Sequence, residues 1–261
     1  MHYLSIITVT YNDKSGFIQT RDSILPLPSN CEWIVIDANS NDGTREVLES
    51  LPQKSNITWL SESDNGIFDG MNKGIDIATG KYIAFMNSGD FYNRGVFEKV
   101  VAKESMAADI IMHNCFTVDE NGNKGRTRSF PDHIEEIKEW ACVQHQSTFY
   151  RKSIFKTLGK YRLEFKYLSD YEHSVRAFLD KNTTFALDSK TRLSYFLQGG
   201  VSTNLDTSLQ VSKEYIVIQK KHFGSCSKKL YVTNMIKVFL NFLPYGDILV
   251  RYLRVVFFNK R

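Results

Sequence analysis

Several common functional signals are missing from this 261-residue sequence. Its six histidines form no HExxH motif, and its four cysteines form no CxxC pair. Closely spaced pairs of these kinds are typical of zinc sites and redox motifs. We therefore interpret the cysteines as reduced thiols, namely Cys31, Cys115, Cys142 and Cys226.

Long apolar runs, internal repeats and low-complexity tracts are absent as well. No apolar run approaches the ~20 residues that a membrane-spanning helix needs. The first residues, Met1-His2-Tyr3, lead directly into an apolar stretch and do not resemble a secretory signal peptide. The sequence therefore predicts a cytoplasmic protein with no transmembrane helix.

The charge is small in total but unevenly distributed. The net charge is +4, yet the part from Ser227 onward has seven Lys and Arg residues and a single acid, Asp247. The remaining 226 residues contain 26 basic and 28 acidic residues. A basic, apolar C-terminal segment indicates an anionic lipid surface as partner rather than a nucleic acid.

The first hundred residues alternate between short apolar runs and amphipathic segments. Strands are predicted at 4–10, 33–37, 57–60 and 81–86, and helices at 15–25, 44–51 and 65–80. Helices that alternate with buried strands are typical of a parallel sheet with right-handed crossovers. The predicted fold class is α/β, with a Rossmann-like, mostly parallel sheet flanked by helices.

After Asp90 the alternation becomes irregular. We predict a helix at 94–105, strands at 109–113 and 147–150, a hairpin of 115–118 with 124–128 around Asn121-Gly122, a helix at 167–180, and strands at 183–187 and 192–196. A polar helix at 205–223 is expected to leave the core, followed by amphipathic helices at 230–243 and from 248 onward. The predicted domains are 1–204, with halves 1–100 and 101–204, and a C-terminal helical appendage, 205–261.

Three carboxylates occupy corresponding positions near the ends of predicted elements. Asp37 ends the second strand, Asp90 follows the fourth, and Asp170 lies near the start of the 167–180 helix. The carboxyl ends of parallel strands meet at one edge of a sheet, where such folds bind ligands. Carboxylate oxygens suit Mg²⁺ or Mn²⁺, so this edge is the predicted site.

Five segments resemble the family 2 glycosyltransferases: VTYN at 9–12, VIDANSNDGT at 35–44, DNGIFDGMNKG at 64–74, ATGKYIAFMNSGD at 78–90 and SDYEHSVR at 169–176. Within that family the sequence is most similar to bacterial O-antigen and exopolysaccharide enzymes of the colanic-acid type. The resemblance covers residues 3–200 and implies a GT-A fold.

The resemblance also implies a nucleotide-sugar site. The VTYN segment would hold the base and ribose through its backbone and Tyr11, and Asp37 would accept a hydrogen bond from the uracil imide. Asp64 and Asn72 would line the ribose and diphosphate. The residues expected to bind nucleotide sugar are Thr10, Tyr11, Asp37, Asp64, Asp69, Asn72, Asn87 and Ser88.

The catalytic roles implied by the resemblance fall on two acids. Asp90 would be the ligand of Mn²⁺ or Mg²⁺, and Asp170 the general base of an inverting reaction. Typical members have several acids at this strand end, where this chain has Asn87 and Gly89. His145 is therefore a candidate for contact with the acceptor, a phosphate or the metal.

Each of these residues also has a structural alternative. Asp37 and Asp90 could cap helices, Asp69 and Asn72 could tie a helix to the sheet, and His145 could be an ordinary buried histidine. Tyr11 could be a core ring and Asp170 a solvated helix residue. The C-terminal helices could pack on the catalytic domain or on a second subunit, which would give a homodimer.

Together these features predict an inverting glycosyltransferase. It would transfer a hexose from a UDP-sugar to an undecaprenyl-diphosphate-linked sugar at the inner face of the cytoplasmic membrane. A catalytically silent sugar-nucleotide-binding protein remains an alternative. A nucleotidyltransferase is a third possibility, although the first strand lacks the Gly-rich, basic loop that would hold a triphosphate.

Overall fold

The computed structural model describes residues 2–103, 107–118, 124–128, 133–139, 143–197 and 207–228, together with 231, 232, 235, 236 and 239. The predicted turn at Asn121-Gly122, Cys142 and the helix predicted from residue 248 lie outside these residues.

Four parallel strands form the first part of the sheet, as predicted. They are β1 (Leu4–Thr10), β2 (Cys31–Asp37), β3 (Ile57–Ser61) and β4 (Tyr82–Phe85). Their order is β3-β2-β1-β4, and Thr10, Asp37 and Ser61 are aligned at their carboxyl ends. The polar residues that follow these strands are thereby brought to one edge.

The second part of the sheet is mixed and differs from the sequence prediction. β8 (Thr148–Arg151) runs antiparallel to β4 and to β6 (Ile110–Val118), and β6 pairs with β7 (Lys124–Arg128) and β9 (Phe185–Leu197). Two predicted strand pairs, 109–113 with 115–118 and 183–187 with 192–196, are each one continuous strand. The polar residues after Asp188 resemble a turn, but Asp188 Oδ1 accepts the N–H groups of Lys190 and Thr191 within an irregular part of β9.

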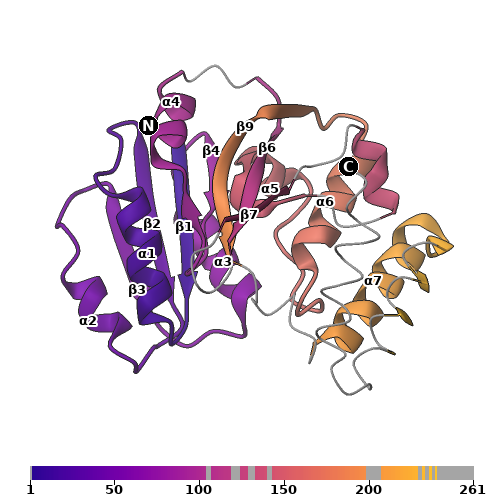
Figure 1. Ribbon diagram of the computed structural model, residues 1–261, viewed down its shortest axis with the longest axis horizontal. Coiled ribbons are helices and arrows are strands. Elements are labelled where there is room, and N and C mark those ends of the chain that lie inside the picture. Colours follow the sequence, from indigo (N-terminus) through magenta and orange to yellow (C-terminus); the bar gives the residue numbers. More distant parts are fainter. Residues whose placement is uncertain are drawn as a thin grey trace.

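Helices cover both faces of the sheet (Figure 1). One face contacts α1 (Lys14–Ile24), α2 (Thr44–Glu49) and α4 (Arg94–Ala102), and the other contacts α3 (Ile67–Ile77), α5 (Ser153–Thr157) and α6 (Ser169–Leu179). In β1, Leu4 and Ile6 lie in the first core, whereas Ile7 and Val9 lie in the second. This is the alternation of side chains expected along a strand buried on both faces.

Helix α3 lies unusually close to β1. A Cβ atom at Gly74 would lie 2.4 Å from Ile7 Cγ2, so the close contact requires a residue without a side chain. A Cβ atom at Gly70 would likewise lie 3.0 Å from Asp64 Oδ2 and 3.1 Å from Val9 Cγ1, so Asp64 and the end of β1 both lie close to this helix.

The last helix with described bounds, α7 (Ser208–Phe223), packs against α6. Val211 and Ile218 are buried with Tyr171 and Val175 of α6, and α7 lies beside α6, away from β1, β2 and β3 (Figure 1). The expectation that this helix leaves the core is therefore wrong, because its apolar stripe is covered by α6. Among the described residues, no helix is long and apolar enough to span a bilayer.

Candidate active site at the carboxyl edge of the sheet

Asp37 is held in place at the end of β2. Its side chain is fully buried, and Oδ2 accepts hydrogen bonds from the Ser40 N–H (3.1 Å) and the Ser61 hydroxyl (2.6 Å). Oδ1 accepts from the Ser40 hydroxyl. The carboxylate caps no helix here, since α2 begins after Gly43. A carboxylate can accept about four hydrogen bonds, which leaves capacity for one more donor.

The turn after β1 places Tyr11 in solvent. Its side chain is 64% exposed, so the alternative of a core ring is wrong. Thr10 is buried, and its hydroxyl has no partner within the described part of the chain. The Asn12 N–H donates to the Ser40 hydroxyl at 2.8 Å, which joins this turn to the loop that holds Asp37.

The turn after β4 is organised by Thr20 of α1. The Thr20 hydroxyl donates to the carbonyl of Asp90 at 2.7 Å and accepts the N–H of Gly89 at 3.1 Å. Gly89 has φ of +91°, a conformation that favours glycine. Ser88 donates to Asp13 Oδ2 at 2.7 Å, while Asp13 Oδ1 caps α1 at Gly16. Asp13 could be found from the sequence as an N-cap residue, but no sequence signal indicated Thr20.

Asp90 is 7% exposed and faces the end of β9. Its Oδ1 accepts the N–H of Leu197 at 2.9 Å, whereas helix α4 begins after Asn93 with no side-chain cap. The capping alternative is therefore wrong for Asp90 as well. This carboxylate instead joins the turn after β4 to the last residue of β9.

A chain of contacts links the turn after β4 to α6. Asn87 Nδ2 lies 3.2 Å from His145 Nε2, and His145 Nδ1 lies 3.4 Å from Asp170 Oδ2. His145 opens η2 (His145–Ser147), directly before β8. The structure thus brings together three residues that are far apart in the sequence. His145 thus lies between Asp170 and Asn87, the latter in the turn after β4.

The residues around the start of α3 have mixed roles. Asp64 Oδ1 accepts the N–H of Gly66 at 2.9 Å, and partial burial, with smaller contributions from nearby acids, raises the pKa of the Asp64 carboxyl. Asp69 accepts both the backbone and side-chain N–H groups of Asn65. Asn72 makes two hydrogen bonds with the backbone of Tyr161, so these contacts tie α3 to the loop after α5 rather than to the sheet.

Two acids that the sequence did not single out support the start of α6. Glu214 of α7 accepts the N–H groups of Lys166, Tyr167 and Leu168 at 2.8 to 2.9 Å. Glu172 is fully buried and contacts two guanidinium groups, those of Arg162 and Arg176, and the imidazole of His222. Together these contacts fix the helix on which Asp170 lies.

Comparison with known proteins decides the family. The family model "Glycosyl transferase family 2" matches residues 5–179. This protein is a family 2 glycosyltransferase. A curated relative, the PGL/p-HBAD biosynthesis glycosyltransferase of Mycobacterium bovis (strain BCG / Pasteur 1173P2), is 26% identical over 218 residues, which are 81% of this chain and 82% of the relative.

Solved structures confirm that the glycosyltransferase has the GT-A fold. S. aureus TarS 1-349 in complex with UDP-GlcNAc has a TM-score of 0.68 at 17% identity, over 91% of this chain and 72% of that one. The mannosyltransferase PcManGT from Pyrobaculum calidifontis, in complex with GDP-Man and Mn2+, has a TM-score of 0.61 at 14% identity, over 89% and 68% of the two chains.

Divalent metals are common in GT-A glycosyltransferases, and two side-chain oxygens after β4 are candidate ligands for such an ion. The described residues contain no group of three or more His, Cys, Asp or Glu side chains that could hold a metal. Mg²⁺ is usually bound by only one or two carboxylates together with substrate phosphates. Asp90 supplies a carboxylate, and Asn87 Oδ1 is a buried oxygen with no partner among the described residues.

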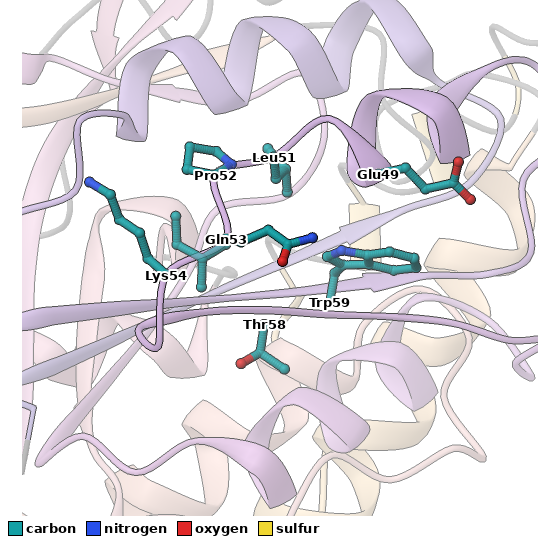
Figure 2. A pocket seen from close by; sticks show the side chains of 8 residues that line it. Glu49, Leu51, Pro52, Gln53, Lys54, Thr58 and Trp59 are labelled. Carbon is teal, nitrogen blue, oxygen red and sulfur yellow. The ribbon is translucent and has the colours of Figure 1, made fainter.

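Two surface hollows differ in their relation to this edge. One, of about 490 Å³, is lined by the loop after α2 and by the first residues of β3, at the opposite end of the strands (Figure 2). The other, of about 330 Å³, lies at the start of α1 and is lined by Asn12, Asp13 and Asp42 among others. Only the second hollow adjoins the candidate site.

Proposed function

We propose that this glycosyltransferase transfers a hexose, with inversion, from a UDP-sugar to a lipid-diphosphate-linked sugar during synthesis of a bacterial O-antigen or exopolysaccharide. The observation that carries the proposal is the connection of Asn87, His145 and Asp170. It places a carboxylate of α6 beside the strand end where a nucleotide sugar would bind.

The donor would bind along the ends of β1 and β2. The uracil imide would be the further donor to Asp37, whose carboxylate is already oriented by Ser40 and Ser61. The exposed ring of Tyr11 would stack on the base. The UDP-GlcNAc complex of TarS, a protein of the same fold, supports the choice of UDP.

The reaction would need one proton transfer and one displacement. Asp170 would take the proton from the acceptor hydroxyl as the acceptor oxygen forms a bond to the anomeric carbon. The bond from that carbon to the diphosphate oxygen breaks, and the nucleoside diphosphate leaves with the electron pair. General-base assistance of this kind contributes about 10²- to 10⁴-fold in rate.

A divalent ion would be held by Asp90 and by Asn87 Oδ1. When bound, it would neutralise the charge that develops on the leaving diphosphate. The remaining residues of the turn, Ser88 and Gly89, would keep these two oxygens in place through their contacts with Asp13 and Thr20.

The lipid-linked acceptor is supported by the C-terminal segment. Val232, Ile236 and Phe239 are exposed and recur at helical spacing, within a part of the sequence that is rich in Lys and Arg. An apolar face with flanking cations would bind at the boundary of an anionic membrane. Replacing Ile236 and Phe239 by Asp should reduce cosedimentation with anionic vesicles, whereas Val217→Asp, on exposed α7 surface, should not.

The test of the proposed activity is a donor screen. UDP- and GDP-sugars would be incubated with a lipid-diphosphate-linked sugar, with and without Mn²⁺, and nucleoside diphosphate release would be measured for the wild type and for Asp170→Asn. We expect turnover with a UDP-sugar that falls about 10²-fold or more in the variant. Release of pyrophosphate from a nucleoside triphosphate, or no turnover of any sugar nucleotide, would overturn the proposal.

A further inference from the structure

We infer that His145 is a positioning residue for Asp170, and that Asn87 on its other side couples it to the donor end of the site. The inference rests on the proposed function, because it gives His145 a role in that reaction. It differs from a role as a ligand of the metal or a contact of the acceptor, since both ring nitrogens already face protein groups.

The geometry restricts the protonation of the ring. Asn87 Nδ2 is a donor and lies 3.2 Å from His145 Nε2, so in this arrangement Nε2 is the acceptor and Nδ1 carries the proton. If the Asn87 amide were turned over, Oδ1 would accept from a protonated Nε2. In a neutral ring that would leave Nδ1 as an acceptor facing the Asp170 carboxylate, so the orientation with Asn87 Nδ2 toward Nε2 is the one compatible with the Asp170 contact.

The surroundings of the ring favour a fixed orientation. The His145 side chain is 20% exposed and that of Asp170 is 25% exposed, so both are accessible to a substrate but bounded by protein. The next residues, Gln146 and Ser147, are buried, and the Ser147 N–H bonds back to Gln144. His145 therefore projects from an anchored turn and can hold the Asp170 carboxylate toward the donor.

Asn87 links the two ends of the site through its two amide atoms. Nδ2 contacts His145, whereas Oδ1 is buried and has no partner in the part of the chain that the structure describes. A sugar nucleotide or a cation that contacts Oδ1 would hold the Asn87 amide in one orientation, and the amide would in turn hold the His145 ring in one orientation. Orientation of the base would then depend on occupancy of the donor site.

The test uses two conservative variants that each keep one side of the ring. His145→Asn places an amide near the position of Nδ1 and keeps the Asp170 contact, whereas His145→Gln places one near Nε2 and keeps the Asn87 contact. We expect His145→Gln to lower kcat about 10- to 100-fold, because small misplacements of catalytic groups have effects of this size, with the KM for the UDP-sugar unchanged. His145→Asn, which loses only the link to Asn87, should retain more activity than His145→Gln, and His133→Asn, at an exposed histidine, should behave as wild type.

Non-additivity separates positioning from other roles. In the Asp170→Asn background, His145→Ala should reduce the residual rate by no more than about twofold, because the group on which it acts has already been removed. Three results would overturn the inference. The first is that His145→Ala lowers the rate in the Asp170→Asn background by the same factor as in the wild type. The others are that added Mn²⁺ restores the rate of the His145 variants, or that these variants change only the KM for the acceptor. Thermal unfolding of each variant identifies a loss due to misfolding, and the residual rate per folded molecule then decides the outcome.

Failure of the inference is distinguishable from failure of the proposed function. A wild-type protein that turns over no sugar nucleotide overturns both. An active wild-type protein whose His145→Gln variant has an unchanged kcat overturns only the role of His145.

Discussion

Two fully buried carboxylates, one at the sheet edge and one in α6, are stabilised by different kinds of partner. Asp37 receives hydrogen bonds from the hydroxyls of Ser40 and Ser61 and from one N–H group. Glu172 instead contacts Arg176 at 2.9 Å, Arg162 at 3.1 Å and His222 at 2.9 Å. Neutral donors orient a carboxylate without cancelling its charge, whereas cations cancel it.

This difference indicates different tasks. The Asp37 carboxylate, at the edge formed by β1, β2 and β4, is held by neutral donors, so it can still interact with a hydrogen-bond donor or a cation of a ligand. The Glu172 carboxylate connects three parts of the chain, because it contacts Arg176 of α6, His222 of α7 and Arg162 in the loop before α6. The first region therefore suits the ligand binding proposed above, whereas the second fixes the helix on which Asp170 lies.

The largest effect on stability should follow the loss of the Glu172 charge. Glu172→Gln keeps the shape of the side chain but leaves the mostly buried Arg176 guanidinium without its carboxylate partner. Breaking a buried ion pair in this way costs about 3 to 5 kcal/mol, whereas Asp37→Asn, which weakens hydrogen bonds from neutral donors to a carboxylate, should cost about 1.5 to 3 kcal/mol. Urea unfolding of both variants measures the difference, and equal losses would refute the distinction between the two regions.

A smaller, pH-dependent effect is expected beside Glu172. Burial, followed by the nearby Arg176 charge, lowers the pKa of His173 to about 3. Below the ordinary pKa of about 6.5, the unfolded chain binds a proton at His173 that the folded chain does not. The free energy of unfolding should therefore fall by about 2 kcal/mol between pH 6.5 and pH 5 from this residue alone.

The matched comparison for this effect is His173→Leu against His133→Leu. Urea unfolding at pH 7 and at pH 5 should show a smaller acid-induced loss of stability in His173→Leu than in the wild type. The exposed control should keep the full loss. If the His173 variant loses as much stability as the control, the acid sensitivity of the α6 region has another source.

The two regions also differ in how far the sequence predicts them. The strand 4–10 was predicted with its observed limits, because an apolar, β-branched run between polar residues has few other interpretations. The strand-end acids followed from it, since parallel strands align their ends. The site residues Thr20 and Glu214 could not be predicted in this way, as their partners lie far away in the sequence.

The contacts of α7 illustrate this limit. Glu214 bonds to backbone N–H groups 46 to 48 residues earlier, and no local pattern records such a pairing. A polar helix with a narrow apolar stripe was for that reason expected to leave the core. Similarly, the turn-like residues after Asp188 concealed the continuity of β9, because the sheet context overrides local turn preference.

The smallest effect on stability should appear at the turn after β4, because the Thr20 hydroxyl contacts neutral backbone groups, including those of Gly89 and Asp90. Thr20→Val keeps the shape of a fully buried side chain but removes the hydroxyl that contacts Gly89 and Asp90. The loss should reduce the free energy of unfolding by about 1 to 2 kcal/mol and increase the Mn²⁺ concentration needed for half-maximal turnover, because Asp90 is then less well oriented. Thr20→Ser, which retains the hydroxyl, should match the wild type in both measurements. A Val variant with an unchanged metal requirement would mean that the backbone conformation at Gly89 and the Leu197 contact suffice to position Asp90, and that hydroxyl donors are not what orients the acids of this edge.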